Sequence, residues 1–139
     1  MPAESNGSTM RFPLTDWPLR LGLAVLLLGV GALASAGEVR ILVQSSPLAG
    51  FQYHTGTANW EQMREGDRLR LVRESDNSHD PKAVRVEWKG AILGYLPRRE
   101  NAAVAAAMDA GEAVDARIAR LREHRNPWQR VLIEVFVTL

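Results

Sequence analysis

Apolar and polar residues alternate in several short segments of the chain and predict a series of β-strands. A period of two places every second side chain on the same face of a sheet, so that one face can be buried while the other meets solvent. The alternating or β-branched segments are residues 39–43, 68–73, 83–88, 91–96, 114–118 and 131–137. The dipeptide Lys89-Gly90 separates two of them and is typical of a two-residue β-hairpin turn.

One helix is predicted between the fourth and fifth of these segments. Six Ala residues, which favour helix more than any other residue type, lie in the stretch from Asn101 to Ala110. Pro97 precedes the stretch, where its missing N–H is harmless, and Gly111 follows it as a stop signal.

The remaining segments complete a prediction of the fold. Residues 75–81 are rich in Asp, Asn and Ser and predict a turn, residues 57–65 favour a short helical turn, and residues 51–54 are expected to be extended. Residues 68–73 place Arg between apolar side chains, which predicts a strand with a basic outer face. About five or six short strands with one or two helices are typical of a mainly β fold, a small antiparallel barrel of the OB or SH3 type.

A long apolar segment precedes the predicted β domain. Between Arg20 and Glu38 lie 17 uncharged residues rich in Leu, Val and Ala. A basic start, a short apolar stretch and the small residues Ala34-Ser35-Ala36 are together typical of a secretory signal peptide. The alternative is a retained membrane anchor, because a segment of this length is at the short end of what spans a bilayer.

These patterns divide the chain into two parts. Residues 1–36 are predicted to form a hydrophobic helix that acts as a signal peptide or membrane anchor, and residues 37–139 to form the β domain. We therefore expect export to the periplasm, or attachment to the inner membrane with membrane contact through residues 21–36. A start at Met10 would give a basic segment of ordinary length. A wrongly assigned start codon that created the leader would instead place the protein in the cytoplasm.

Composition removes several classes of chemistry. The chain has no Cys, which excludes a disulfide framework, a thiol nucleophile and a Cys-based zinc site. The net charge of +1 does not indicate a strongly basic nucleic-acid binder, although a local basic patch is compatible with it. Basic residues are 15 Arg and 2 Lys, and five of the Arg lie in residues 117–130, a run typical of a solvated face.

Catalytic and metal-binding motifs are sparse. The three histidines, His54, His79 and His124, lack the spacing of metal ligands on a helix and do not cluster with carboxylates along the chain. No nucleophile elbow, phosphate-binding P-loop or dinucleotide-binding Gly-rich turn occurs. We therefore expect a binding protein and not an enzyme, with no catalytic residues, no metal site and no cofactor.

Aromatic and basic side chains indicate a class of ligand. Phe51 and Tyr53 lie near a loop, Tyr95 ends a strand, and Arg98 and Arg99 stand before the predicted helix, whose N-terminus favours anions. Rings that stack on bases, together with cations that meet phosphates, are what a single-strand binder requires. The alternative interpretation places both Phe51 and Tyr53 in the core and leaves the two arginines solvated.

Three segments carry a resemblance to a known family. They are Gly50-Phe51-Gln52-Tyr53-His54-Thr55-Gly56, the stretch from Leu69 to Val86 that contains Asp76-Asn77-Ser78-His79-Asp80-Pro81, and Leu93-Gly94-Tyr95-Leu96-Pro97. In order and spacing they resemble the HIRAN domain over about residues 43–137. This resemblance implies a small OB- or SH3-like β-barrel with helices packed on it. In a fork-remodelling helicase of the family, the domain captures the free 3′ end of single-stranded DNA.

The resemblance also implies roles for individual residues. Tyr53 takes the position of an aromatic that stacks on the terminal bases, and His54 that of a second tyrosine. Asp80 matches the acidic residue that accepts a hydrogen bond from the terminal 3′-hydroxyl. In the family's Asn-Pro-Tyr-Asp pattern, Ser78 here replaces the proline and His79 the tyrosine, which reduces the stacking face.

Further positions follow from the same resemblance. Tyr95 and Arg98 match positions that contact backbone phosphates, and Trp128 lies in a region where the family has another aromatic. The candidate nucleic-acid-binding residues are thus Gln52, Tyr53, His54, His79, Asp80, Tyr95 and Arg98.

Two functions remain open. The first is a nucleic-acid-binding module for single-stranded DNA with free 3′ ends. The second is an exported interaction module that keeps the β-barrel, has lost DNA-end binding, and contacts a protein or envelope partner. The changes at Ser78 and His79 and the predicted leader favour the second function, whereas the retained aromatic and arginine side chains favour the first.

Overall fold

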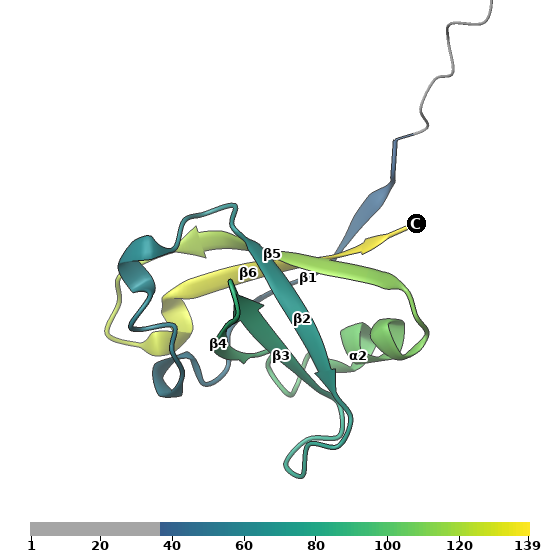
Figure 1. Cartoon of the computed structure of the whole chain (residues 1–139), viewed down its shortest axis with the longest axis horizontal. Helices are drawn as coiled ribbons and strands as arrows, with labels where there is room; N and C mark the ends of the chain where they lie inside the picture. Colours follow the sequence, from purple (N-terminus) through teal and green to yellow (C-terminus); the bar gives the residue numbers. More distant parts are fainter. Residues whose placement is uncertain (1–36) are drawn as a thin grey trace, which may run out of the picture. The chain divides into compact units, whose positions relative to one another are not determined.

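The computed structural model of the chain describes residues 37–139, and Figure 1 shows its course. The predicted signal peptide or anchor, residues 1–36, lies outside the described residues and stays a prediction. The described elements are β1 (Arg40–Pro47), η1 (Phe51–Tyr53), η2 (Trp60–Gln62), β2 (Arg68–Glu74), β3 (Ala83–Trp88), β4 (Ala91–Tyr95), α2 (Ala102–Asp109), β5 (Ala113–Leu121), η3 (Pro127–Gln129) and β6 (Val131–Thr138). Each predicted strand and the predicted helix is confirmed, and η2 confirms the short helical turn.

Between residues 37 and 139, no helix is long and apolar enough to cross a bilayer.

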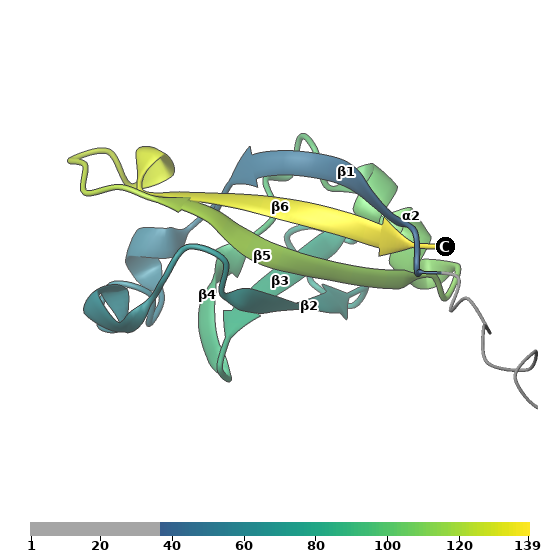
Figure 2. The ribbon, with the colours of Figure 1, turned by 90° about the horizontal axis from the view of Figure 1, so that it is seen from above.

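The strands form one antiparallel sheet of six, in the order β1-β6-β5-β2-β3-β4. The long strands β1, β6 and β5 lie side by side in Figures 1 and 2, and the shorter β3 and β4 lie beyond β2. Lys89 and Gly90 join β3 to β4 with φ angles of 46° and 83°, the left-handed pair that a tight hairpin turn requires. The mainly β prediction is therefore confirmed.

The sheet is not the closed barrel that the sequence predicted. Its edge strands β1 and β4 do not pair with each other, and the chain just after β1 meets β4 at an isolated bridge, where Ala49 and Tyr95 exchange two backbone hydrogen bonds of 2.8 and 3.0 Å. Pro47, which ends β1, has no N–H to donate to a further ladder. Three residues later Gly50 adopts a φ of 73° and turns the chain away into η1. These two residues stop β1 and β4 from pairing along their length.

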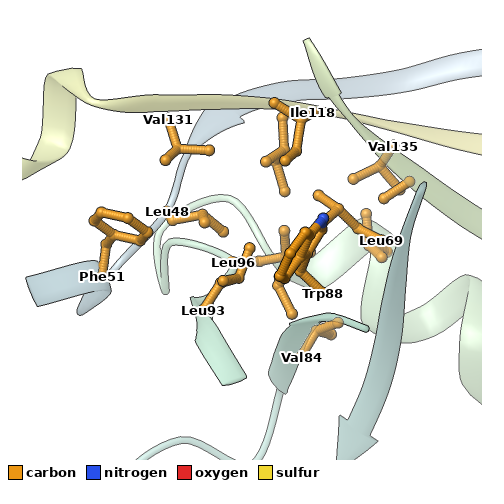
Figure 3. Packing of buried hydrophobic residues seen from close by; sticks show 14 of the residues in the cluster. Leu48, Phe51, Leu69, Val84, Trp88, Leu93, Leu96, Ile118, Val131 and Val135 are labelled. Carbon is orange, nitrogen blue, oxygen red and sulfur yellow. The ribbon is translucent and has the colours of Figure 1, made fainter. Parts of the chain in front are cut away.

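A hydrophobic core lies on the inner face of this curved sheet (Figure 3). Alternate side chains of β6 point inward, with Ile133 and Val135 completely buried. Trp88 crosses the core while its indole N–H donates to Asp67 at 2.9 Å, which satisfies the polar edge of the ring. The helix α2 covers the core through Val104 and its neighbours.

The helical elements gather at two ends of the sheet. In both Figure 1 and Figure 2, the three single turns η1, η2 and η3 lie at one end, and α2 lies at the other. Contacts between η1 and β4 and between η1 and η3 hold this first end together. The candidate residues around Tyr53 are therefore placed on short turns that the sheet edge supports.

Gly94 provides a test of how the two sheet edges meet. A Cβ atom at this position would lie 2.4 Å from the carbonyl oxygen of Ala49, and the φ of Gly94 is +153°. We expect Gly94→Ala to break the bridge between Ala49 and Tyr95 and to lower the free energy of unfolding by roughly 2 kcal/mol or more. Urea denaturation followed by circular dichroism measures this loss.

Gly90→Ala is the matched control for Gly94→Ala. Gly90 also has a positive φ, of 83°, but a Cβ there would meet nothing within 4 Å. Its substitution should cost only the left-handed backbone strain, about 1 kcal/mol. Equal losses in the two variants would contradict the importance of the close approach at Ala49.

Candidate nucleic-acid interface

The turn η1 separates two aromatic side chains. Gly50 starts the turn, and the N–H of Tyr53 donates to the carbonyl of Gly50 at 3.0 Å. Residues 51–53 therefore form a helical turn and are not extended as the sequence predicted, whereas His54 is extended. The turn buries Phe51, with 1% of its surface exposed, and leaves Tyr53 82% exposed. The interpretation that placed both rings in the core is thus correct for Phe51 and wrong for Tyr53.

A shallow groove of about 450 Å³ lies beside Tyr53. This Tyr53 groove is lined by Tyr53, His54, Thr55, Gly90, Ala91 and Ile92. The hydroxyl of Thr55 donates to the carbonyl of Ile92 at 2.8 Å and ties the turn after η1 to strand β4. Gln52 is exposed next to Tyr53 on the same turn. The groove thus combines an exposed phenol ring with an apolar strand edge.

His54 connects this groove to strand β4. Its ring packs against that of Tyr95, with 5.8 Å between the centroids and a tilt of 54°. Tyr95 in turn donates its hydroxyl to the carboxylate of Glu74 at 3.2 Å. Burial and the Glu74 carboxylate both raise the pKa of Tyr95, which keeps the hydroxyl protonated as a donor.

Glu74 is the meeting point of several donors. Besides Tyr95, its carboxylate accepts from the side-chain amide of Asn77 at 3.0 Å and pairs with the guanidinium of Arg85. Burial alone would raise the pKa of Glu74, but hydrogen bonds from Asn77, Arg85 and Tyr95 outweigh it, so the pKa lies below its usual value. Arg85 also pairs with the buried Glu87 at 2.9 Å. The Glu74 carboxylate is therefore ionised and accepts hydrogen bonds from three side chains.

Asn77 carries this network into the loop between β2 and β3. Its side-chain oxygen accepts from the backbone N–H groups of His79 at 2.9 Å and Asp80 at 3.2 Å. Such a turn, closed by an Asn side chain, needs no proline to hold its shape. His79 is exposed at the outside of the loop, and Asp80 is half-buried.

Both carboxylate oxygens of Asp80 have structural partners. One accepts from the N–H of Lys82 at 2.9 Å and the other from the side-chain amide of Asn101 at 2.7 Å. Burial would raise the pKa of Asp80, but these donors and the charges of Arg98 and Arg73 bring it below its usual value. Each oxygen still has a lone pair for a further donor, so an ionised Asp80 can accept from a ligand hydroxyl.

Arg73 stabilises the loop between β2 and β3 through hydrogen bonds to its backbone. Its guanidinium donates to the carbonyl oxygens of Pro81 at 2.7 Å and Ala83 at 3.1 Å, and it pairs with Asp109 of α2 at 3.0 Å. The side chain is only 16% exposed. The predicted basic outer face of this strand is therefore wrong for Arg73, whereas Arg68 and Arg70 are exposed.

Asn101, just before α2, has one partner and one unused group. Its amide donates to Asp80, while within residues 37–139 its buried Oδ1 atom has no hydrogen-bond partner. The opposite orientation of the amide would put this oxygen against the Asp80 carboxylate, so electrostatics fixes the orientation seen. Arg98 and Arg99, which precede Asn101 in the chain, are exposed.

A chain of side-chain contacts thus links several of the candidate residues. Contacts run from His54 to Tyr95, from Tyr95 through Glu74 to Asn77, and from Asn77 to Asp80. Tyr53 and Gln52 flank one end of it and Arg98 the other. Trp128, on η3, is 46% exposed, and η3 contacts η1.

Sequence reasoning missed four residues that organise this surface. They are Arg73, Glu74, Asn77 and Asn101. Asn77 could have been found, because an Asn two or three residues before an Asp within a polar turn is typical of a side-chain-closed turn. The others act across strands or between a strand and a helix, so only the register reveals them.

Fold and surface together define a small antiparallel β domain with an exposed face of aromatic, acidic and basic side chains. The family model for the HIRAN domain matches residues 41–139. The chain therefore belongs to the HIRAN domain family.

Two solved structures are similar to the chain. A protein from Lactobacillus plantarum shares 25% identity and a TM-score of 0.64, over 73% of this chain and 98% of that one. The HIRAN domain of human HLTF shares 19% identity and a TM-score of 0.51, over 71% of this chain and 77% of that one, and shows similarity of fold. No curated protein sequence matches the chain.

The lowered pKa values of Glu74 and Asp80 predict how stability depends on acid. A carboxyl group with a lower pKa in the folded state stabilises the fold above its unfolded pKa, and this contribution is lost as pH falls through the folded value. We expect the free energy of unfolding to decline below about pH 4. Glu74→Gln should reduce it by about 1–3 kcal/mol at pH 7 and by much less at pH 3.

Urea denaturation of both proteins at the two pH values checks this prediction. A difference between wild type and Glu74→Gln that stays the same at pH 7 and pH 3 would contradict the role of the ionised carboxylate.

Proposed function

We propose that the domain binds single-stranded DNA at a free 3′ end, through the surface that runs from Tyr53 to Asp80 and Arg98. Membership of the HIRAN family supports nucleic-acid binding. The observation that carries the finer proposal is the placement of an ionised, half-buried Asp80 in one network of hydrogen bonds and ring contacts with the turn that exposes Tyr53.

Tyr53 supplies the stacking platform. A ring that is 82% exposed on this turn has little packing role and can contact a base on its face. His54 is held against Tyr95 and widens this platform. Stacking of this kind tolerates any base, which suits recognition of an end without regard to sequence.

Asp80 supplies the selection for a hydroxyl end. An ionised carboxylate accepts a hydrogen bond from a 3′-hydroxyl, whereas a 3′-phosphate or a continuing phosphodiester would bring like charge beside it. Asn77 and Asn101 fix the position of the carboxylate. The turn keeps this geometry although Ser78 and His79 replace the proline and tyrosine of the family pattern.

Exposed cations complete the surface. Arg98 and Arg99 precede α2, and Lys82 follows the Asp80 turn; all three are exposed. Neutralisation of phosphates by such side chains releases counterions, so binding should weaken as salt concentration rises.

Tyr53→Ala tests the stacking platform. Because the ring is exposed, we expect the melting temperature to stay within a few degrees of wild type while affinity for a single-stranded oligonucleotide falls about tenfold or more. Fluorescence anisotropy with a 5′-labelled oligothymidylate measures the affinity. Tyr53→Phe keeps the ring face and should bind like wild type, and equal binding by the alanine variant would contradict the platform.

Asp80→Asn tests selection of the end while preserving the local structure. The new amide can donate to the unused Oδ1 of Asn101 once the amide of Asn101 turns over, so the loop keeps its hydrogen bonds. Wild type should bind a free 3′-hydroxyl about tenfold more tightly than a 3′-phosphate. The variant should lose most of that preference, because the repulsive charge is gone.

Paired anisotropy titrations with the two kinds of strand give the ratio directly. Equal binding of both strands by wild type would contradict end recognition, and binding of neither strand would contradict a nucleic-acid function.

A further inference from the structure

A second cavity borders η1 and shares no lining residue with the Tyr53 groove. It measures about 510 Å³ and is formed by two separate segments, the turns around Phe51 and Trp60 and the connection between β5 and β6. We call it the Trp60 cavity. Its size is in the range of sites that hold small organic groups, including a nucleobase.

Aromatic rings form one side of the Trp60 cavity. Phe51 and Trp60 meet edge to face, with 6.1 Å between centroids and 67° between planes. Phe51 is buried, whereas Trp60 packs against the core with part of its indole and remains half-exposed where it lines the cavity. The indole therefore offers a flat surface on which a planar ring can stack.

Polar side chains form the other side. Arg130 donates through Nε to the carbonyl of His124 at 2.7 Å, and Nδ1 of His124 accepts from the N–H of Asn126 at 2.9 Å. In the neutral imidazole, Nε2 then carries the proton and is free to donate. These bonds fix the loop that brings His124, Arg125 and Arg130 to the cavity.

The cations of this loop have no anionic partner in the described part of the chain. No carboxylate lies within ion-pair distance of Arg125 or Arg130 between residues 37 and 139, although Glu123 also lines the cavity. An uncharged apolar ligand would desolvate these guanidinium groups without compensation. A planar ring attached to a phosphate satisfies both the indole and the cations.

We propose that the Trp60 cavity binds a further nucleobase of the same strand, upstream of the two nucleotides at its 3′ end. This inference rests on the proposed function, since the strand must first be held at Tyr53 and Asp80. The two sites are neighbours, because η1 contributes Phe51 to one and Tyr53 to the other. Trp60 stacks on the base, and Arg125 and Arg130 contact the adjoining phosphate.

A length series of oligonucleotides tests this second site. The full-length protein is titrated with 5′-labelled oligothymidylates of increasing length, from a dinucleotide upward, each with a free 3′-hydroxyl. Wild type should gain affinity once the strand is long enough to reach the cavity. Trp60→Leu should lower the affinity for the long strands about tenfold and leave the affinity for the dinucleotide unchanged.

Arg125→Ala keeps the test valid if the Trp60 variant does not fold, because Arg125 is exposed. This substitution should weaken the binding of long strands alone. It should also reduce the magnitude of the slope of log K against log salt concentration by about 0.7, the value for one phosphate contact on a single strand. Arg122→Ala, an exposed arginine that does not line the cavity, is the matched control and should match wild type.

The outcomes separate the two proposals. A dinucleotide that binds with no gain for longer strands, or a gain that survives both substitutions, would overturn the second base site and leave recognition of the 3′ end intact. Failure of strands of every length to bind would overturn both.

Discussion

The Glu74 carboxylate at the end of β2 is the interaction on which the candidate surface depends. Tyr95, Asn77 and Arg85 all donate to it, and they come from β4, from the β2–β3 loop and from β3. A half-buried anion with three donors is most stable when all three stay in place, because leaving a partly desolvated charge unpaired is costly. The carboxylate therefore fixes the relative positions of three chain segments at once.

Two consequences for the surface follow from this constraint. On one side, a fixed Tyr95 ring supports His54 and, through the bridge to Ala49, the start of the η1 turn. On the other side, a fixed Asn77 closes the turn that aims Asp80. The positions of Tyr53 and Asp80 are thus linked through Glu74, although the two side chains have no partner in common. A preorganised arrangement of this kind lowers the entropic cost of binding a flexible ligand.

Local patterns in the sequence were sufficient for much of the fold. Strand alternation, the Lys89-Gly90 turn and the Ala-rich helix depend on neighbours along the chain, and all were predicted correctly. The predicted closure of the sheet into a barrel was wrong, because closure depends on how Pro47 and Gly50 end one edge strand in three dimensions. The burial of the two rings at η1 was also predicted incompletely, because the helical turn that replaces the expected extended segment buries Phe51 and exposes Tyr53.

The candidate site divides in the same way. Side chains that would touch a ligand could be named from the family resemblance, whereas those that hold them in place could not. Glu74 lies 21 residues from Tyr95 along the chain, and Asp80 is equally far from Asn101. Only the strand register and the packing of α2 bring these partners together. Arg73 illustrates the limit most clearly, since alternation placed it among solvated arginines and the structure encloses it between a loop and a helix.

Titration of the ¹⁵N-labelled protein with a short oligothymidylate, followed by NMR of the backbone amides, tests whether Tyr53, Asp80 and Arg98 contact the same strand. If they do, signals from residues 52–55, 77–82 and 98–101 move together with a common dissociation constant. Shifts in only one of these segments, or shifts confined to another face of the sheet, would contradict that shared contact.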